Sequence, residues 1–466
     1  MSYANKSVHA HLRRFWAILL GCLTALAPLS VKGQQPSLPT CPRQDGYYLA
    51  ASPVYEQDQT LFLTQITPLG LWRSNDGGRI WNTLVDLSNF HGISAGKPYL
   101  VPSPPDPEYH IYLPWVYNVI YGPGTYFSML WYSDDSGVTW DARQPCPGDC
   151  TFDLYLTNDS DMLFGLEHSS YTWPASGIWR NDSGGVYHWT RVWNGTETGW
   201  LAVAPNFAQE QTVFASLRER SPELGSPVIV STDSGETWQG AGGDDLCDEA
   251  AGSVQISSGF TQDRTLFVHQ ASSLFESQDA GETWSVVFPP DRPHCQPGVV
   301  APTVDSYKLS SSFGRDHTLY AVTTGPSNDH RLLVSGDGGA TWTLQSNVSR
   351  STSLLWVLPA AAGSNAREEV QANARSPLPK ALEDVGWSPS SSRATVLDSN
   401  WTIFLPQVDW TAAQPVARPF TLFIRARNEM DESTYYRSDD GGVTWACMQL
   451  PTVQSPFRTT YLGRGR

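Results

Sequence analysis

The chain has 466 residues, of which 40% are hydrophobic, and it carries a formal net charge of −16. This hydrophobic content, with 19 Trp and 19 Tyr, supports a packed core and excludes a disordered chain. The acidic balance excludes sequence-independent nucleic-acid binding, which needs a basic footprint, and favours a soluble monomer.

Residues 1–33 have the order of a secretory signal peptide. A basic stretch at 9–14 precedes an apolar run at 15–29, and a polar, Pro-rich stretch follows. The apolar run is shorter than the roughly 20 residues that a membrane-spanning helix needs, and no later segment is long and apolar enough. We therefore expect a secreted or cell-surface protein with no membrane span. A lipoprotein anchor at Cys22 is the alternative, which the short apolar stretch before that cysteine disfavours.

Six cysteines follow the predicted signal peptide. An even number in an exported chain favours disulfides, and no cysteine pair has the two-residue spacing and matching second pair of a zinc site. Two of the cysteines flank the repeats described below and would meet if those repeats closed a ring. The possible pairs are Cys41–Cys447, Cys146–Cys150 and Cys247–Cys295.

After a linker at 34–45, one short motif recurs along the chain, and we call each copy a box. The box "STDSGETW" (231–238) reappears as "SDDSGVTW" (133–140), "SQDAGETW" (277–284), "SGDGGATW" (335–342) and "SDDGGVTW" (438–445). Two weaker copies are "SNDGGRIW" (74–81) and "RNDSGGVYHW" (180–189), which lacks the first serine and has two extra residues. The seven copies place aspartates at Asp76, Asp135, Asp182, Asp233, Asp279, Asp337 and Asp440, and tryptophans at Trp81, Trp140, Trp189, Trp238, Trp284, Trp342 and Trp445.

Each position of a box suits a tight hairpin. Gly235 tolerates positive φ, and the carboxylate of Asp233 can accept hydrogen bonds from backbone N–H groups inside the turn. Thr237 restarts a strand, and Trp238 can pack beneath the hairpin or against the next blade. The box aspartates are therefore predicted to be structural, not catalytic.

The segments around each box predict four short antiparallel strands per repeat, which is one blade of a β-propeller. In the fourth repeat these strands fall at 201–205, 212–217, 228–232 and 236–241. The repeats predict an all-β, seven-bladed propeller over 46–450, followed by a tail at 451–466. The gap between the last two boxes is about twice as long as the others and holds a predicted insertion at 346–393, either a lid or a disordered loop.

After the insertion, 401–407 and 419–426 are predicted to be the first two strands of the last blade. An eighth blade without a box, within 350–411, is the alternative.

The boxes resemble the Asp-box, or BNR repeat, of sialidase-type β-propellers, and the resemblance covers nearly all of the chain after the signal peptide. It implies that the boxes lie on peripheral hairpins, away from a central site. The family includes sialidases, two-propeller xyloglucanases, sortilin-type receptors and photosystem II assembly factors, so its chemistry is not shared. The assembly factors are similar in size and in having one propeller, which supports an interaction scaffold.

Catalytic patterns of the family are missing. Its sialidases bind the sugar carboxylate through three arginines, the first in an Arg-Ile-Pro motif, whereas the opening blade at 46–65 has no arginine. Its xyloglucanases place two carboxylates across a cleft between two propellers, and this chain has room for one propeller. The acids Asp106, Glu108, Asp153 and Asp161 are interpreted as solvated loop residues.

The function expected from these patterns is non-catalytic binding or scaffolding, with a protein or glycan partner on the central face and loops. A glycoside hydrolase, sialidase-like or acting on a neutral polysaccharide, is the alternative. No cofactor or metal site is expected, because the boxes lack the oxygen ligands of a calcium loop. The aromatic residues Trp115, Tyr117, Tyr121 and Tyr126 are interpreted as two core strands and their turn, or as a binding loop.

Overall fold

The computed structural model describes residues 38–44, 46–52, 54–65, 70–86, 93–95, 98–102, 109–118, 126–143, 150–156, 162–169, 175–182, 188–195, 197–270, 272–289, 302–325, 328–349, 351–360, 420–427 and 432–451. All of them lie in the compact unit that runs from Pro36 to Arg466. The predicted signal peptide (1–33) and residues 452–466 of the predicted tail lie outside the described residues.

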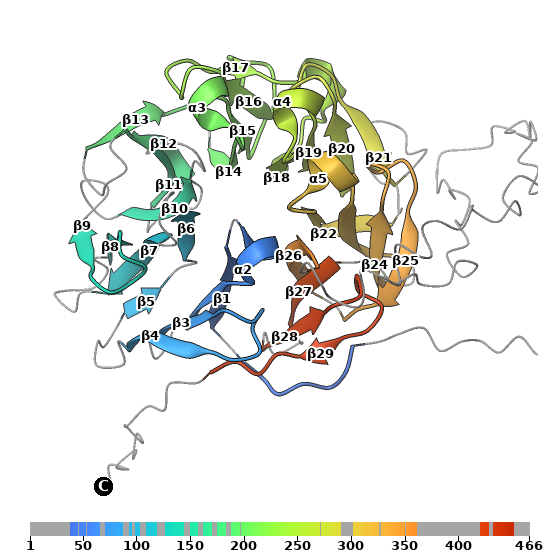
Figure 1. Ribbon diagram of the computed structural model, residues 1–466. Coiled ribbons are helices and arrows are strands. Elements are labelled where there is room, and N and C mark those ends of the chain that lie inside the picture. Colours follow the sequence, from blue (N-terminus) through green and yellow to red (C-terminus); the bar gives the residue numbers. More distant parts are fainter. Residues whose placement is uncertain are drawn as a thin grey trace, which may run out of the picture. The chain divides into compact units, whose positions relative to one another are not determined.

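The described residues form a seven-bladed β-propeller of four-stranded antiparallel blades, as the repeats predict. Within a blade, the strands pair in chain order, and in blade 7 a long stretch of sequence separates the first strand from the second. The first strand of a blade lies toward the centre of the ring and the fourth lies at its outside (Figure 1). Loops that join strands one to two and three to four therefore lie at one end of the blade, and all other loops lie at the opposite end.

The strands have the following bounds. Blades 1 and 2 contain β1 (Tyr47–Ala51), β2 (Leu61–Gln65), β3 (Gly70–Ser74), β4 (Asn82–Asp86), and then β5 (Ile93–Ala95), β6 (Tyr99–Pro102), β7 (Tyr109–Asn118), β8 (Tyr126–Ser133) and β9 (Asp141–Arg143). Blades 3 and 4 contain β10 (Cys150–Leu156), β11 (Leu163–Ser169), β12 (Ala175–Asn181), β13 (Trp189–Trp193), and then β14 (Thr198–Val203), β15 (Val213–Leu217), β16 (Val228–Ser231) and β17 (Gln239–Gly240). Blades 5 and 6 contain β18 (Ala251–Ile256), β19 (Leu266–Gln270), β20 (Ser273–Ser277), β21 (Ser285–Phe288), and then β22 (Thr303–Leu309), β23 (Leu319–Thr324), β24 (His330–Ser335) and β25 (Thr343–Asn347). Blade 7 contains β26 (Thr352–Pro359), β27 (Phe420–Arg427), β28 (Ser433–Ser438) and β29 (Ala446–Cys447).

Two blades depart from this plan. In blade 2, the short strands β5 and β6 both pair with β7, so they share the place of a first strand. The sheets of blades 3 and 4 are joined by one residue pair, Ala175 and Thr198.

The second strands are buried on both faces, because neighbouring blades cover them. Every residue of β2 (LFLTQ) and of β15 (VFASL) is buried. This explains why these strands are near-continuous apolar runs and do not alternate with polar residues.

Four-residue helices join the first and second strands of blades 1, 4, 5 and 6. They are α2 (Tyr55–Asp58), α3 (Phe207–Glu210), α4 (Phe260–Asp263) and α5 (Phe313–Asp316). The first residue of each helix is a buried aromatic that packs edge-on against a ring in the second strand of the preceding blade, as in the pairs Tyr55–Phe423, Phe207–Phe164, Phe260–Phe214 and Phe313–Phe267. These helices fix the spacing between neighbouring blades.

The ring closes between blade 1, which contains the first strands of the chain, and blade 7, which contains the last. A disulfide joins Cys41 to Cys447, as the flanking positions of these residues predict. The Tyr435 hydroxyl donates to the Tyr47 carbonyl oxygen at 2.7 Å, and the Gln44 N–H donates to the Ser433 carbonyl oxygen at 2.9 Å. A shared apolar cluster of both blades supports these bonds.

The predicted boundaries of the last blade need a correction. Residues 352–359 form β26, which pairs with β27, so the first strand of blade 7 precedes the insertion and lies within the predicted range 346–393. The strand predicted at 401–407 lies outside the described residues, and the one predicted at 419–426 corresponds to β27. β26 (TSLLWVLP) is itself apolar, so a strand signal was present, but the Ala-, Ser- and Pro-rich sequence that directly follows it was grouped with it.

Candidate functional site

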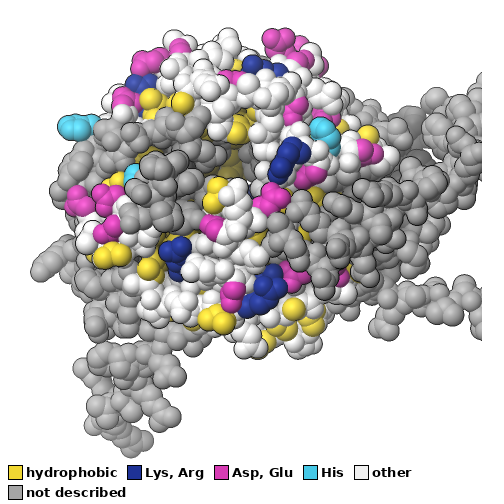
Figure 2. All heavy atoms as spheres, viewed as in Figure 1, with side chains coloured by type: hydrophobic (Ala, Val, Ile, Leu, Met, Phe, Trp, Pro, Cys, Tyr) yellow, Lys and Arg dark blue, Asp and Glu magenta, His cyan; other side chains and the backbone are white. Residues whose placement is uncertain are grey.

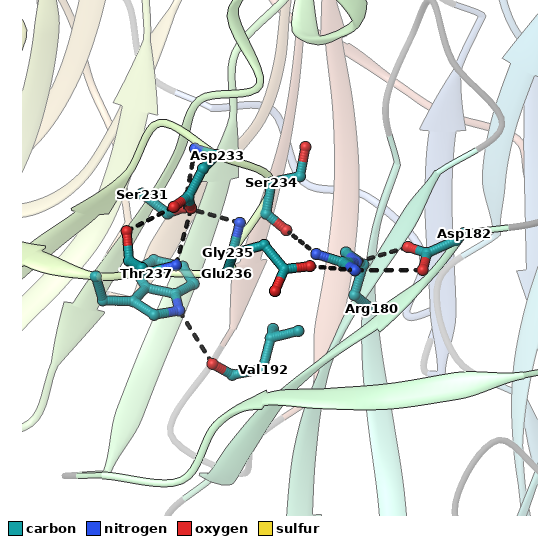
Figure 3. Close-up of polar contacts among 10 residues, drawn as sticks. Arg180, Asp182, Val192, Ser231, Asp233, Ser234, Gly235, Glu236 and Thr237 are labelled. Carbon is teal, nitrogen blue, oxygen red and sulfur yellow. Dashed lines mark hydrogen bonds and ion pairs between the residues drawn. The ribbon is translucent and has the colours of Figure 1, made fainter.

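Six boxes form the same hydrogen-bonded turn. In blade 4, Ser231 Oγ donates to Asp233 Oδ1 at 2.7 Å and accepts the Gly235 N–H at 2.7 Å, while the Thr237 N–H donates to Asp233 Oδ1 at 2.9 Å (Figure 3). Gly235 has φ of +88°, so an L side chain there would be strained. The bonds of Asp76, Asp135, Asp279, Asp337 and Asp440 follow this pattern.

These bonds favour the ionised carboxylates. In Asp135, the bonds from the Thr139 N–H and hydroxyl lower the pKa to about 2. In Asp233, burial raises the pKa, but the hydroxyl and N–H of Thr237 outweigh burial and hold the pKa below its usual range. A carboxylate held in this way is a poor proton donor at neutral pH, so the box turns are unsuited to acid catalysis.

The box of blade 3 is a correction to the sequence alignment. Strand pairing places Asn181 opposite Leu163, as Ser231 lies opposite Val213, so Asn181 takes the place of the box serine. Asp182 then lies one position before a box aspartate, and it accepts from Arg180 Nε at 2.6 Å instead of closing a turn. The two extra residues before Trp189 misled the alignment by sequence, which matched Asp182 with the box aspartates. Residues 183–187 lie outside the described residues.

Each box also contacts the blade before it. Trp238 Nε1 donates to the Val192 carbonyl oxygen in β13 at 3.2 Å, and Trp342 Nε1 donates to the Val287 carbonyl oxygen in β21 at 3.1 Å. A Cβ added at Gly235 would lie 3.2 Å from Val192. Trp238 and Trp342 therefore pack on the preceding blade, where the sequence suggested the hairpin itself or the next blade, whereas Trp140 Nε1 donates to the Gly137 carbonyl oxygen of its own hairpin at 3.0 Å.

The helical turns form a second hydrogen-bonded arrangement that recurs from blade to blade, on the same face as the boxes. In α4, the carboxylate of Asp263 accepts from Ser257 Oγ at 2.5 Å and from the Thr265 N–H at 2.9 Å. Asp58 and Asp316 make the same two bonds in α2 and α5. The carbonyl oxygen of Arg264, which ends α4 in a left-handed conformation, accepts the Ala280 N–H of the box in the same blade at 2.9 Å.

Charged side chains of the helical turns on this face are paired with one another. Arg315 of α5 lies 3.2 Å from the Glu56 carboxylate of α2, and Arg264 pairs with Glu210 of α3. Figure 2 shows Lys and Arg interspersed with Asp and Glu on the visible described surface, with no large patch of one sign. The described arginines of the helical turns are thus bound to carboxylates of the fold and do not converge on a free ligand site.

Two exposed aromatic residues project from the innermost strands. Trp200 in β14 is 49% exposed and Tyr48 in β1 is 36% exposed. A β-bulge between Thr198 and Trp200 shifts the register of β14 against β15, which re-aims the side chains at this point. Large exposed rings on the inner strands can stack on a sugar or anchor a protein partner. Trp200 was not among the predicted residues, although a tryptophan next to Gly199 at the start of a first strand is a signal of a bulge.

The strands that flank the predicted aromatic loop are described, and the loop itself lies outside the described residues. Trp115 and Tyr117 belong to β7 and Tyr126 begins β8, which are antiparallel neighbours, while Tyr121 lies outside the described residues. Two antiparallel strands are therefore present here, as predicted, and the binding role of the loop between them stays a prediction.

Blade 6 contains a chain of polar side chains at the end opposite to the boxes. Thr324 Oγ1 donates to Asp305 Oδ2 at 2.6 Å and lies 2.9 Å from His330 Nδ1. Because the Thr324 hydroxyl donates its hydrogen to Asp305, it can only accept from His330, so Nδ1 is the donor in this contact. His330 Nε2 and His269 Nε2 are buried without a hydrogen-bond partner among the described residues.

Burial disfavours the charged form of one basic side chain in blade 5 and of one in blade 6. Burial lowers the pKa of His269, although a bond to the Val304 backbone and the charge of Asp305 raise it. Burial also lowers the pKa of Lys308 in β22. The described residues contain no group of three or more His, Cys, Asp or Glu side chains that could hold a metal ion.

A second segment with a disulfide-bonded cysteine lies at the junction of blades 4 and 5. Cys247 is disulfide-bonded, and its N–H donates to Gln270 Oε1 at 2.8 Å. The predicted partner Cys295 lies outside the described residues, as does Cys146 of the other predicted pair, so both of these pairings stay predictions. None of the helices in the described part of the chain has the length and apolar character needed to cross a bilayer.

Comparisons with known proteins return folds only. No family model and no curated protein matches the sequence. Among solved structures, the chain is similar to the GH74 xyloglucanase from Xanthomonas campestris, at 15% identity and a TM-score of 0.37 over 88% of this chain and 46% of that one. It is also similar to the GH74 enzyme of Niastella koreensis, at 14% identity and a TM-score of 0.39 over 87% of this chain and 57% of that one.

An oligogalacturonate lyase in complex with manganese is similar at 11% identity and a TM-score of 0.43, over 65% of this chain and 78% of that one. The chain thus spans about half the length of the two GH74 enzymes that it resembles. At these identities and scores, the similarities carry no argument about activity.

Proposed function

We propose that this chain is an exported β-propeller of the Asp-box type that binds a protein or glycan partner without catalysis. The observation that carries the proposal is the exposure of Trp200, which projects from an innermost strand with 49% of its surface open to solvent. Most large apolar side chains in this fold are buried, so an exposed tryptophan on an inner strand is informative. A ring in this place can stack on a sugar or fill a pocket of a protein partner.

The carboxylates of the described turns support binding over hydrolysis. Asp58, Asp263 and Asp316 close the helical turns, and the box aspartates close the hairpins. Glycoside hydrolysis by two carboxylates needs an opposed pair, roughly 5 to 10 Å apart, and these aspartates are held by bonds within their own turns. The disulfide between Cys41 and Cys447 supports export, because such bonds persist in oxidising compartments.

The test is a glycan array together with a panel of fluorogenic glycosides, applied to the purified protein. We expect binding of one glycan or protein class, weakened about tenfold or more by Trp200→Ala. Ile80→Ala is the matched control, because Ile80 is 66% exposed but belongs to a box. Turnover of any glycoside that is lost on substitution of a single Asp or Glu would overturn the proposal and support a hydrolase.

A further inference from the structure

The residue directly before the box serine position faces the box of the next blade. In blade 3 this residue is Arg180, whose Nη1 donates to the Ser234 carbonyl oxygen at 2.8 Å and whose Nη2 lies 2.8 Å from the Glu236 carboxylate (Figure 3). In blade 7 it is Arg437, which donates to the Gly77 carbonyl oxygen of blade 1. The side chains of Arg180 and Arg437 are only 11% and 12% exposed.

Both arginines lie opposite an aromatic residue of the second strand. Arg437 lies with Cζ 5.7 Å from the ring centre of Phe423, its partner in the register of β27 and β28. Arg180 lies opposite Phe164 in the same register. Both guanidinium groups thus bond a box carbonyl oxygen of the next blade. Arg437 adds a ring face to this socket, and Arg180 adds a box glutamate.

The junction of blades 4 and 5 has this socket without the arginine. Val230 takes the place of Arg180 and lies opposite Phe214. The box of blade 5 supplies Ala280 and Glu282 at the positions of Ser234 and Glu236. A groove of about 430 Å³ is lined by these four residues, and no ion pair of the described residues involves Glu282.

Other described junctions do not combine these features. Val334 of blade 6 also lacks the guanidinium, but Val443 stands in the next box where Glu282 stands here. Glu276 of blade 5 places an acid in the arginine position, and its next box has Ala340 in the glutamate position. Only the junction of blades 4 and 5, among those described, keeps the acid and lacks the cation.

We infer that the groove between blades 4 and 5 binds the guanidinium of an arginine side chain supplied by a partner polypeptide. The fork of a guanidinium can bond the Ala280 carbonyl oxygen and the Glu282 carboxylate together, as Arg180 bonds Ser234 and Glu236 at its own junction. Arg264 also lines the groove, but its charge is paired with Glu210. The net charge of −16 favours approach of a basic partner.

This inference goes beyond the proposed function, because it concerns the box side of a blade junction and not the inner-strand surface of Trp200. Failure of the glycan experiment therefore leaves it standing, and its own failure leaves the binding role of Trp200 standing. It also names the partner chemistry, an exposed arginine on a polypeptide. An ammonium group cannot form the planar fork, so lysine is the discriminating comparison.

The test uses N-acetyl-arginine amide as the probe, titrated into the whole protein and followed by NMR. We expect a Kd of about 1 to 10 mM, since so small a ligand has limited affinity, and binding about tenfold weaker for N-acetyl-lysine amide and N-acetyl-citrulline amide. Glu282→Gln should weaken arginine binding about tenfold. Glu236→Gln, in the box whose socket Arg180 already fills, is the matched control and should leave binding unchanged.

A second variant fills the socket from within. Val230→Arg should abolish probe binding, and if it does not fold, the Glu282→Gln comparison still decides. Equal binding of arginine and lysine probes, an unchanged affinity in Glu282→Gln, or no binding at about ten times the expected Kd would each overturn the inference.

Discussion

Ring closure through Cys41 and Cys447 is the feature of this fold whose removal should be most costly. Each blade takes its four strands from one continuous stretch, so no strand from one end of the chain completes the blade of the other. The disulfide spans a sequence separation of 406 residues. The chain-entropy relation for a loop of this length gives about 6 kcal/mol, which is a ceiling, and native disulfides commonly contribute about 2–5 kcal/mol.

Replacing both cysteines by serine should therefore lower the free energy of unfolding by about 2–5 kcal/mol. The noncovalent contacts between blades 1 and 7, such as Tyr435 to Tyr47, keep the ring together but open more often. Urea unfolding followed by tryptophan fluorescence measures the loss, and hydrogen exchange locates it. Exchange should accelerate in β1 and β28 and stay unchanged in β15, which lies in blade 4.

Arg43→Gln is the matched control, because it removes the ion pair with Glu432 from the same segment and leaves the disulfide intact. Arg43 is 59% exposed, so its loss should cost less than about 1 kcal/mol. A double-serine variant as stable as the Arg43 variant, or exchange that rises equally in β15, would refute the argument that the disulfide holds the ring closed.

Four further predictions concern the turns and junctions. Asp233→Ala should cost about 1–2 kcal/mol of unfolding free energy with ligand affinity unchanged, and denaturant unfolding should show a smaller loss for Asp182→Ala, which closes no box turn. Arg180→Lys keeps the charge but loses the fork, so the same assay should show a loss of about 1–3 kcal/mol, and no loss would contradict the socket geometry. The pKa of Asp135 is lowered to about 2 in the folded state, below an unfolded value of about 3.9. The stabilisation from this carboxylate is therefore present above a pH of about 4 and is lost as the pH falls toward 2. NMR titration of the carboxyl group of Asp135 can check this. Burial raises the folded pKa of Glu276, so the free energy of unfolding of the wild type should fall as the pH rises above the unfolded pKa of about 4.3. Glu276→Gln should remove this contribution to the pH dependence, as measured by denaturant unfolding at several pH values.

The hairpin chemistry could be predicted from the sequence because it is local. Ser231, Asp233 and Thr237 lie within seven residues, and their bonds are set by the conformation of one turn. The number of blades followed from counting such turns. The alignment of the blade 3 box was wrong because its extra residues moved the glycines relative to Asn181, and only the pairing of β11 with β12 revealed the shift.

The helical turns and Trp200 show what local patterns missed. A helix of four residues, such as α4, is too short to show a helical period, although Ser257, Asp263 and Thr265 recur at constant spacing in other repeats. Trp200 is exposed because β14 carries a bulge, and a bulge depends on the register of the neighbouring strand.

The sequence by itself determined the all-β repeat and the box turns, and it offered Cys41–Cys447 as a possible pair that the structure confirms. Only the tertiary structure decided which side chain meets which box across a blade junction. Arg180 and Ser234 are 54 residues apart, and no periodic pattern links a residue in one blade to a carbonyl oxygen in the next. Val230 is an ordinary strand residue in the sequence, and it marks an unfilled arginine socket only because packing sets it where Arg180 stands one blade earlier.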